Sequence, residues 1–154
     1  MKRTLRMVAA GVLVAAFVVA GQTAATASPR AGALHVTKEC SQYTGAAGSF
    51  CTITSSNIKA IKVGARVVYS SAANPDGTLD SDVIIDAGHG NRLFGHVTLN
   101  ATTMHIWLTG GTGIFRHFTG SAAVTVTDAG TPQELWHWDG TYHFGSDRYR
   151  HSHH

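Results

Sequence analysis

The chain is poor in basic residues once its first few positions are set aside. It has twelve Lys and Arg against nine Asp and Glu, a formal net charge of +3. Lys2, Arg3 and Arg6 account for that whole excess. The rest of the sequence is formally neutral and has no basic cluster with which to neutralise phosphates. The composition therefore predicts no nucleic-acid partner and no electrostatic attachment to an anionic membrane.

Those three basic residues begin a segment that is typical of a secretory leader. An uncharged apolar run covers residues 7–21 and is followed by the small residues Ala25-Thr26-Ala27. This order matches a signal peptide, and the run is shorter than the ~20 residues of a membrane-spanning helix. We therefore expect residues 1–27 to be cleaved and the protein to be secreted. Residues 28–145 are expected to form one β-barrel domain, and residues 146–154 a polar, histidine-rich tail.

Cysteine is scarce as well, since the chain has only Cys40 and Cys51. Exported cysteines meet an oxidising environment, so the sequence predicts a Cys40–Cys51 disulfide. By restricting the unfolded chain, a bond across so short a loop contributes roughly 2–3 kcal/mol. A structural metal site needs three or four converging ligands, so two cysteines alone make a poor one.

Histidine is abundant, but its spacing does not indicate a metal centre. Three of the ten histidines, His151, His153 and His154, belong to the tail. No HxH or HExxH pair occurs within the domain, and His137 and His143 are six residues apart. Because a specific site needs several ligands at close spacing, we interpret these histidines as structural or surface residues. The sequence predicts neither a metal nor any other cofactor.

Helical periodicity is missing from the whole chain after the leader, whereas short β-rich segments between Gly-rich turns recur throughout it. The connection over residues 57–64 has Ile58, Ile61 and Val63 to hold it to the core. Closure removes exposed strand edges, so we predict an all-β fold with a single antiparallel β-barrel of about eight strands. The expected strands are 33–37, 51–55, 65–72, 79–87, 92–100, 104–109, 120–127 and 136–144.

The last of these segments, Trp136 to Phe144, is the most aromatic stretch of the chain. Asp139-Gly140 in its middle is also a strong hairpin signal. A hairpin there would scatter the aromatic side chains over both faces. A single strand would align Trp136, Trp138 and Tyr142 on one face, because alternate residues share a face. The alternation therefore favours one long strand in the barrel wall.

Phasing the other strands in the same way gives an apolar face and a polar face. The simplest interpretation is a packed apolar lumen and a solvated exterior. The functional alternative keeps this phasing but leaves the lumen partly open, so that aromatic walls hold a small apolar molecule. The candidate residues for lining such a lumen are Tyr69, Leu99, Trp136, Trp138, Tyr142 and Phe144.

One stretch resembles a known family. Gly95-His96-Val97-Thr98-Leu99, the run Leu108-Thr109-Gly110-Gly111-Thr112-Gly113-Ile114-Phe115 and Gly120 are similar to the corresponding parts of allene oxide cyclases. Dirigent proteins carry a similar Gly-Gly-Thr-Gly-x-Phe element. The resemblance covers roughly residues 65–144 and implies an eight-stranded antiparallel barrel. Its motif residues are Gly110, Gly111, Gly113, Phe115 and Gly120, where glycines allow a sharp corner and Phe115 plugs the barrel end.

The same resemblance implies a function for the lumen. It suggests a secreted barrel that holds a small hydrophobic molecule and templates a cyclisation or isomerisation by folding its substrate. The glutamate and proline associated with the family's chemistry have no counterpart in residues 51–57, and the sequence identifies no catalytic residue. The alternative is a non-catalytic barrel with a filled core that acts through its surface on a protein or the cell wall. Both alternatives stay open, as does assembly into a homo-oligomer.

Overall fold

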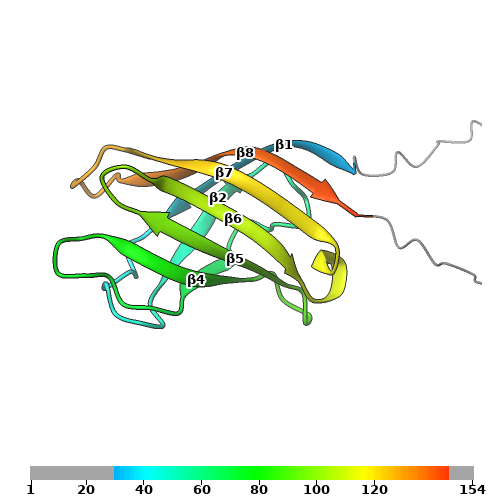
Figure 1. Ribbon diagram of the computed structural model, residues 1–154, viewed down its shortest axis with the longest axis horizontal. Helices are drawn as coiled ribbons and strands as arrows, with labels where there is room; N and C mark the ends of the chain where they lie inside the picture. Colours follow the sequence, from blue (N-terminus) through cyan, green and yellow to red (C-terminus); the bar gives the residue numbers. More distant parts are fainter. Residues whose placement is uncertain (1–29, 146–154) are drawn as a thin grey trace, which may run out of the picture.

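The computed structural model describes residues 30–145, which form eight strands and one short 3-10 helix (Figure 1). The predicted leader and tail lie outside these residues. No helix in the described part is long and apolar enough to cross a membrane. The elements are β1 (Ala31–Glu39), β2 (Phe50–Ser56), β3 (Arg66–Tyr69), β4 (Leu79–Asp86), β5 (Arg92–Leu99), β6 (Met104–Gly111), η1 (Gly113–Phe115), β7 (Phe118–Thr127) and β8 (Leu135–Phe144).

The eight strands form one closed antiparallel barrel. Each strand pairs with its neighbours in the sequence, and β1 completes the cylinder by pairing with β8. In this last pairing Val36 lies opposite Trp138, whose other neighbour is Val124 of β7. A disulfide joins Cys40, just after β1, to Cys51 of β2. The predicted fold class and the predicted disulfide are both confirmed.

The aromatic segment forms the single strand β8, without a hairpin. Asp139 pairs with His35, and Gly140 pairs with Leu34, so the ladder continues through the Asp-Gly pair. Gly140 serves close strand packing, since a Cβ atom there would collide with the backbone of Ser121 on β7. The predicted alternation is present, with Trp138 inside the barrel and Asp139 exposed.

Two strand lengths differ from the expected ones. The strand expected over residues 65–72 is limited to Arg66–Tyr69. Beyond it, the Ser71 amide donates to the Ser81 side chain instead of to a ladder carbonyl. In contrast, β1 extends two residues past the expected end at Thr37. This extension carries Lys38 into the barrel wall.

The middle of the lumen is filled with side chains. The fully buried residues there include Trp138, Val36, Ile53, Val67 and Val83, each with at most 2% of its surface exposed. The structure therefore has no opening through the middle of the lumen, and the partly open lumen of the functional hypothesis is limited to the ends of the barrel. Any ligand has to bind at an end of the barrel or on its outside.

The connection between β6 and β7, which includes η1, lies at one end of the barrel, on the right in Figure 1. Phe115 of η1 is fully buried and packs edge-on against Phe118, with ring centroids 5.8 Å apart. The predicted glycines shape this corner. A Cβ atom on Gly111 would collide with the Arg92 carbonyl group, and Gly113 has a positive φ of 59°.

The connection between β2 and β3 lies at this same end. Ile58 and Ile61 are buried, as expected, but Val63 is 65% exposed, so its predicted packing role is wrong. The chain turns sharply here, because the Ala65 amide donates to the Lys62 carbonyl group. This turn directs the Val63 side chain to solvent.

Candidate functional site

A cavity of about 160 Å³ lies at the other end of the barrel, where β1 ends and β8 begins. Its walls come from β1, β2, β3, β4, β5 and β8, together with the connections that follow β1 and precede β8. They are mostly apolar or aromatic and also carry one amine and one carboxylate. The lining residues are Lys38, Cys40, Tyr43, Cys51, Tyr69, Leu79, Leu99, Glu134 and Trp136.

Lys38 is the residue that gives this cavity its chemistry. It continues the inward-facing series Leu34, Val36, Lys38 of β1 and lies opposite Trp136 of β8. Only 3% of its surface is exposed. A lysine so deeply buried is unusual unless it is paired with an acid, which makes its surroundings informative.

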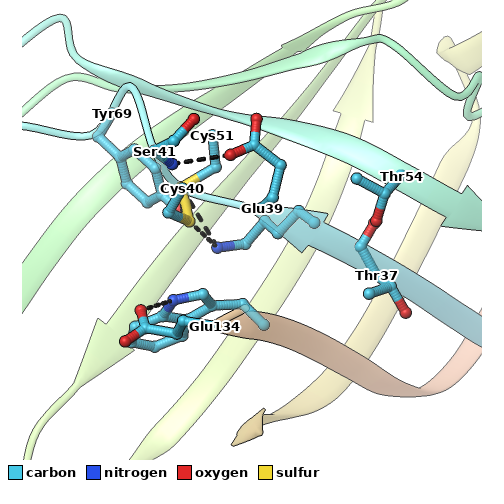
Figure 2. The surroundings of a disulfide bond; sticks show 10 residues. Thr37, Glu39, Cys40, Ser41, Cys51, Thr54, Tyr69 and Glu134 are labelled. Atoms are coloured by element: carbon cyan, nitrogen blue, oxygen red, sulfur yellow. Dashed lines mark hydrogen bonds between the residues drawn. A yellow bond between two sulfur atoms is a disulfide. The ribbon is translucent and has the colours of Figure 1, made fainter. Parts of the chain in front are cut away.

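The ε-amino group of Lys38 lies against the disulfide and three aromatic rings. Its Nζ donates to Cys40 Sγ at 3.4 Å and to Cys51 Sγ at 3.6 Å (Figure 2). The same atom is 5.0 Å from the ring centroid of Trp136, and the rings of Tyr69 and Trp138 are at 5.6 and 5.8 Å. Disulfide sulfur is a weak acceptor, so these contacts only partly replace the water that the amine loses.

Glu134 is the carboxylate on the cavity wall, but other groups hold it. Its Oε1 accepts the indole N–H of Trp136 at 2.7 Å, as Figure 2 shows, and its Oε2 accepts the Gly130 amide at 2.8 Å. Among residues 30–145, Lys38 forms no ion pair with any acid. Burial therefore dominates and lowers the pKa of Lys38 to about 7, although the charge of Glu134 opposes the shift. Near neutral pH the amine is about half uncharged.

Two tyrosines complete the polar content of the cavity. Their rings meet edge-on, with centroids 5.0 Å apart. The Tyr69 hydroxyl lies 3.6 Å from Cys51 Sγ, whereas the buried Tyr43 hydroxyl has no hydrogen-bond partner among the described residues. Burial raises the pKa of both phenols. Because buried hydroxyls are nearly always hydrogen-bonded, a Tyr43 hydroxyl without a partner among the described residues is unusual.

The structure brings together three of the six predicted lumen residues. Tyr69, Leu99 and Trp136 line the cavity. Trp138 is buried next to it, 1% exposed, with its ring beside the Lys38 amine. Tyr142 and Phe144 lie at the opposite end, where their rings contact Phe118 at centroid distances of 5.7 and 4.8 Å. These two also border open surface hollows that are separate from the cavity.

Sequence reasoning missed Lys38, Tyr43 and Glu134. A signal for Lys38 was present, since extending the alternation of Leu34 and Val36 by two residues places it inside. The predicted strand ended at Thr37, so Lys38 was not assigned to either face of it. No comparable pattern marks Tyr43 or Glu134, because both lie in connections whose paths a strand pattern does not define.

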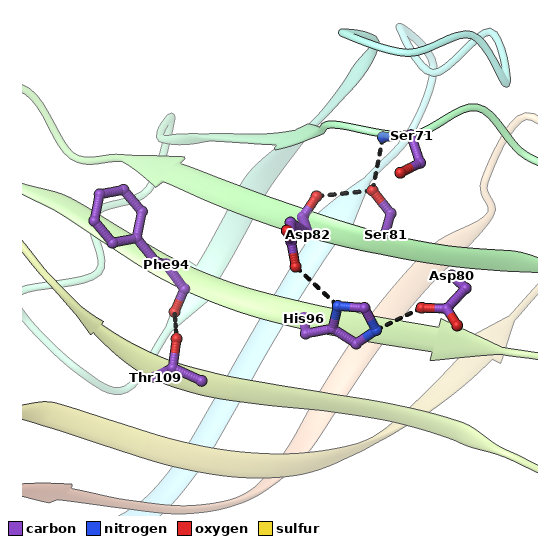
Figure 3. Close-up of polar contacts among 7 residues, drawn as sticks. All are labelled: Ser71, Asp80, Ser81, Asp82, Phe94, His96 and Thr109. Carbon is purple, nitrogen blue, oxygen red and sulfur yellow. Dashed lines mark hydrogen bonds and ion pairs between the residues drawn. The ribbon is translucent and has the colours of Figure 1, made fainter.

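Figure 3 shows a polar cluster on the outer surface of the barrel. His96 of β5 lies between Asp80 and Asp82 of β4, with its Nδ1 at 2.9 Å from Asp82 Oδ1. The hydrogen bond to Asp82, helped by Asp80, raises the pKa of His96. The two carboxylates are largely solvent-exposed, and His96 is half-buried. Within residues 30–145, no three His, Cys, Asp or Glu side chains are arranged to hold a metal ion.

No protein-family model matches the chain, and no curated protein and no solved structure matches it either. The functional proposal therefore rests on the geometry of the barrel and the contents of its cavity.

Proposed function

We propose that this protein is secreted and holds a small, mainly apolar molecule in the cavity at the Lys38 end of the barrel. The observation that carries the proposal is the contrast between a packed lumen and this one recess. The recess has aromatic and aliphatic walls, and among residues 30–145 its buried amine has no acid partner and the Tyr43 hydroxyl has no hydrogen-bond partner. Such a combination of apolar walls and few polar groups is typical of small-molecule sites.

The volume of the cavity limits what it holds. A cavity of about 150 Å³ lined by apolar side chains is known to bind benzene. At about 160 Å³, this recess suits a molecule of that size, or one end of a longer molecule whose remainder stays outside.

The same proposal includes kinship with the allene oxide cyclase and dirigent barrels. The closed eight-stranded antiparallel barrel and the corner at Gly110 to Phe115 are consistent with this kinship. Under it, the rigid walls would restrict the conformations of a bound molecule and so favour one cyclisation or isomerisation. The apolar, largely preformed recess is the feature that suits such a template.

Indole NMR signals provide a direct test. We expect benzyl alcohol to shift the Trp136 indole N–H signal, because that side chain lines the cavity, and to leave the signal of the outward-facing Trp107 unchanged. Leu99→Trp should fill the recess and abolish the effect. Thr98→Trp, on the outer face of the same strand, is the matched control and should preserve it. Saturable shifts that persist in Leu99→Trp, or none in the parent protein, would refute cavity binding.

A second candidate function is binding through the outer surface to a protein or the cell wall. Trp107 of β6 is 40% exposed and Phe94 of β5 is 37% exposed, which places two large aromatic side chains on one wall of the barrel. Exposed aromatic residues often mark interaction sites. If Trp107→Ala abolishes retention on isolated cell walls while Leu99→Trp does not, this second function is favoured.

A further inference from the structure

We propose that Lys38 is a carbonyl-reactive amine, which condenses with an aldehyde or ketone group of the apolar molecule in the cavity to form an imine. This inference rests on the proposed function, since it assumes that the cavity admits such a molecule. It adds the chemical class of the ligand and the atom that captures it.

The first support is the position of the amine. Lys38 lines the cavity, is almost wholly buried and has no acid partner in the described part of the chain. Its hydrogen-bond partners are the two disulfide sulfurs. Neither sulfur holds the amine as firmly as a carboxylate would, so the nitrogen can turn towards a ligand.

The second support is the protonation state of the amine. Only an uncharged amine has the lone pair that attacks a carbonyl carbon, and burial in an apolar pocket is one established way to provide it. Burial lowers the pKa of Lys38 to about 7. The titratable groups that face the cavity beside it are Glu134, Tyr43 and Tyr69. Burial raises the pKa of both phenols, so they are uncharged near neutral pH. Among these three groups, only Glu134 carries a charge there, and this negative charge favours the protonated form of Lys38.

The third support concerns the type of ligand. A carboxylate ligand would satisfy a protonated Lys38, but it would also bring a second negative charge to a cavity that already contains Glu134. An uncharged carbonyl compound avoids this repulsion. The polar groups of the cavity therefore favour a neutral carbonyl over an anion.

The chemical step needs no co-reactant. The Nζ lone pair forms a bond to the carbonyl carbon, the C=O π electrons move to the oxygen, and a proton passes from the nitrogen to that oxygen to give a neutral carbinolamine. The hydroxyl then gains a proton and leaves as water while the nitrogen lone pair forms the C=N bond, and the resulting iminium loses its remaining N–H proton to give the imine. The sum is amine plus carbonyl giving imine plus water, and hydrolysis reverses it.

Reductive trapping with benzaldehyde and cyanoborohydride at pH 7 tests this step, with peptide mapping of the benzylated lysines. Lys59 and Lys62 are exposed and serve as internal controls. An ordinary exposed lysine is uncharged in only about one molecule in 2,500 at pH 7. We therefore expect Lys38 to be modified at least roughly tenfold faster than either control, with a rate that levels off above about pH 7.

Variants and a non-reactive probe separate the explanations. Lys38→Met should abolish the fast modification, the matched Lys62→Met should retain it, and Leu99→Trp should slow it by filling the cavity. If benzyl alcohol binds but Lys38 reacts no faster than Lys59, the reactive amine is refuted while the cavity function stands. If benzoate binds more tightly than benzaldehyde, the cavity prefers anions and the proposal of a carbonyl-reactive Lys38 also fails. If no probe binds, both proposals fail.

Discussion

Replacing Lys38 by Met should stabilise the barrel and change how its stability depends on pH. Methionine retains an unbranched chain of similar length and adapts well to irregular packing. It removes the amine, which is buried against sulfur and aromatic rings and has no acid partner among residues 30–145. Replacing buried charged groups by apolar residues of similar volume is often stabilising.

The size of the effect follows from the lowered pKa of Lys38. In the unfolded chain the amine has a pKa near 10.4, and in the barrel it is about 7. Each pH unit between these values corresponds to about 1.4 kcal/mol, so the buried amine destabilises the barrel by roughly 4 kcal/mol at neutral pH. Between pH 7 and 10 the unfolded state binds more protons, and the free energy of unfolding therefore rises with pH. Above about pH 10 the buried tyrosines reverse this trend, since their pKa values are raised.

Urea unfolding at several pH values from 6 to 10, with the disulfide intact, measures this dependence. The parent protein should gain up to about 4 kcal/mol between pH 7 and 10, whereas Lys38→Met should be nearly flat and more stable at pH 7. Lys62→Met, which removes an exposed lysine, is the control and should follow the parent. Parallel curves for the parent and Lys38→Met would refute the claim that Lys38 is buried without a compensating partner.

Three further predictions concern other contacts. Glu134→Gln should lower the pKa of Lys38 further, because it removes the charge that raises it. Trp136→Phe should raise that pKa, because it frees the Glu134 carboxylate from the indole. NMR titration of the lysine ε-carbon measures both changes, and two changes of the same sign would contradict this role of Glu134. Trp138→Ala should destabilise the barrel by about 3–5 kcal/mol in urea unfolding, because it leaves a cavity in the packed lumen. His96→Gln should remove a stabilisation present below about pH 6.5 and lost as pH rises through the raised pKa of His96. At this exposed position the difference should be no more than about 1 kcal/mol.

The fold was predictable because its signals are local and repeated. In β8 the alternation of large aromatic residues with polar ones was strong enough to outweigh the hairpin signal of Asp139-Gly140. The Cys40–Cys51 bond followed from there being only two cysteines in a chain that we expect to be exported. Each signal depends on neighbouring residues or on composition, and neither needs the three-dimensional arrangement.

The cavity was only half predictable, because it depends on which strand ends meet. Periodicity assigned Tyr69, Leu99, Trp136 and Tyr142 to one face, but a face has no position along the barrel axis. The pairing register is what separates Tyr142 from the other three. Lys38 was lost for a different reason, since the strand pattern was ended as soon as a charged residue interrupted the apolar alternation.

Lys38, the residue that interrupts the apolar inner face of β1, is the feature of the barrel that most strongly indicates a function. A lysine on the inner face opposes the packing that closes the rest of the lumen, and a leucine or methionine there would serve stability better. The disulfide and the Trp136 ring lie against it and carry no charge, and the carboxylate on the cavity wall, Glu134, is held by an indole and a backbone amide. A structural lysine would be expected to have an acid partner. The absence of an acid within ion-pair distance in the described part of the chain is instead what keeps an amine reactive, so the sequence at this end of the barrel favours chemistry over stability.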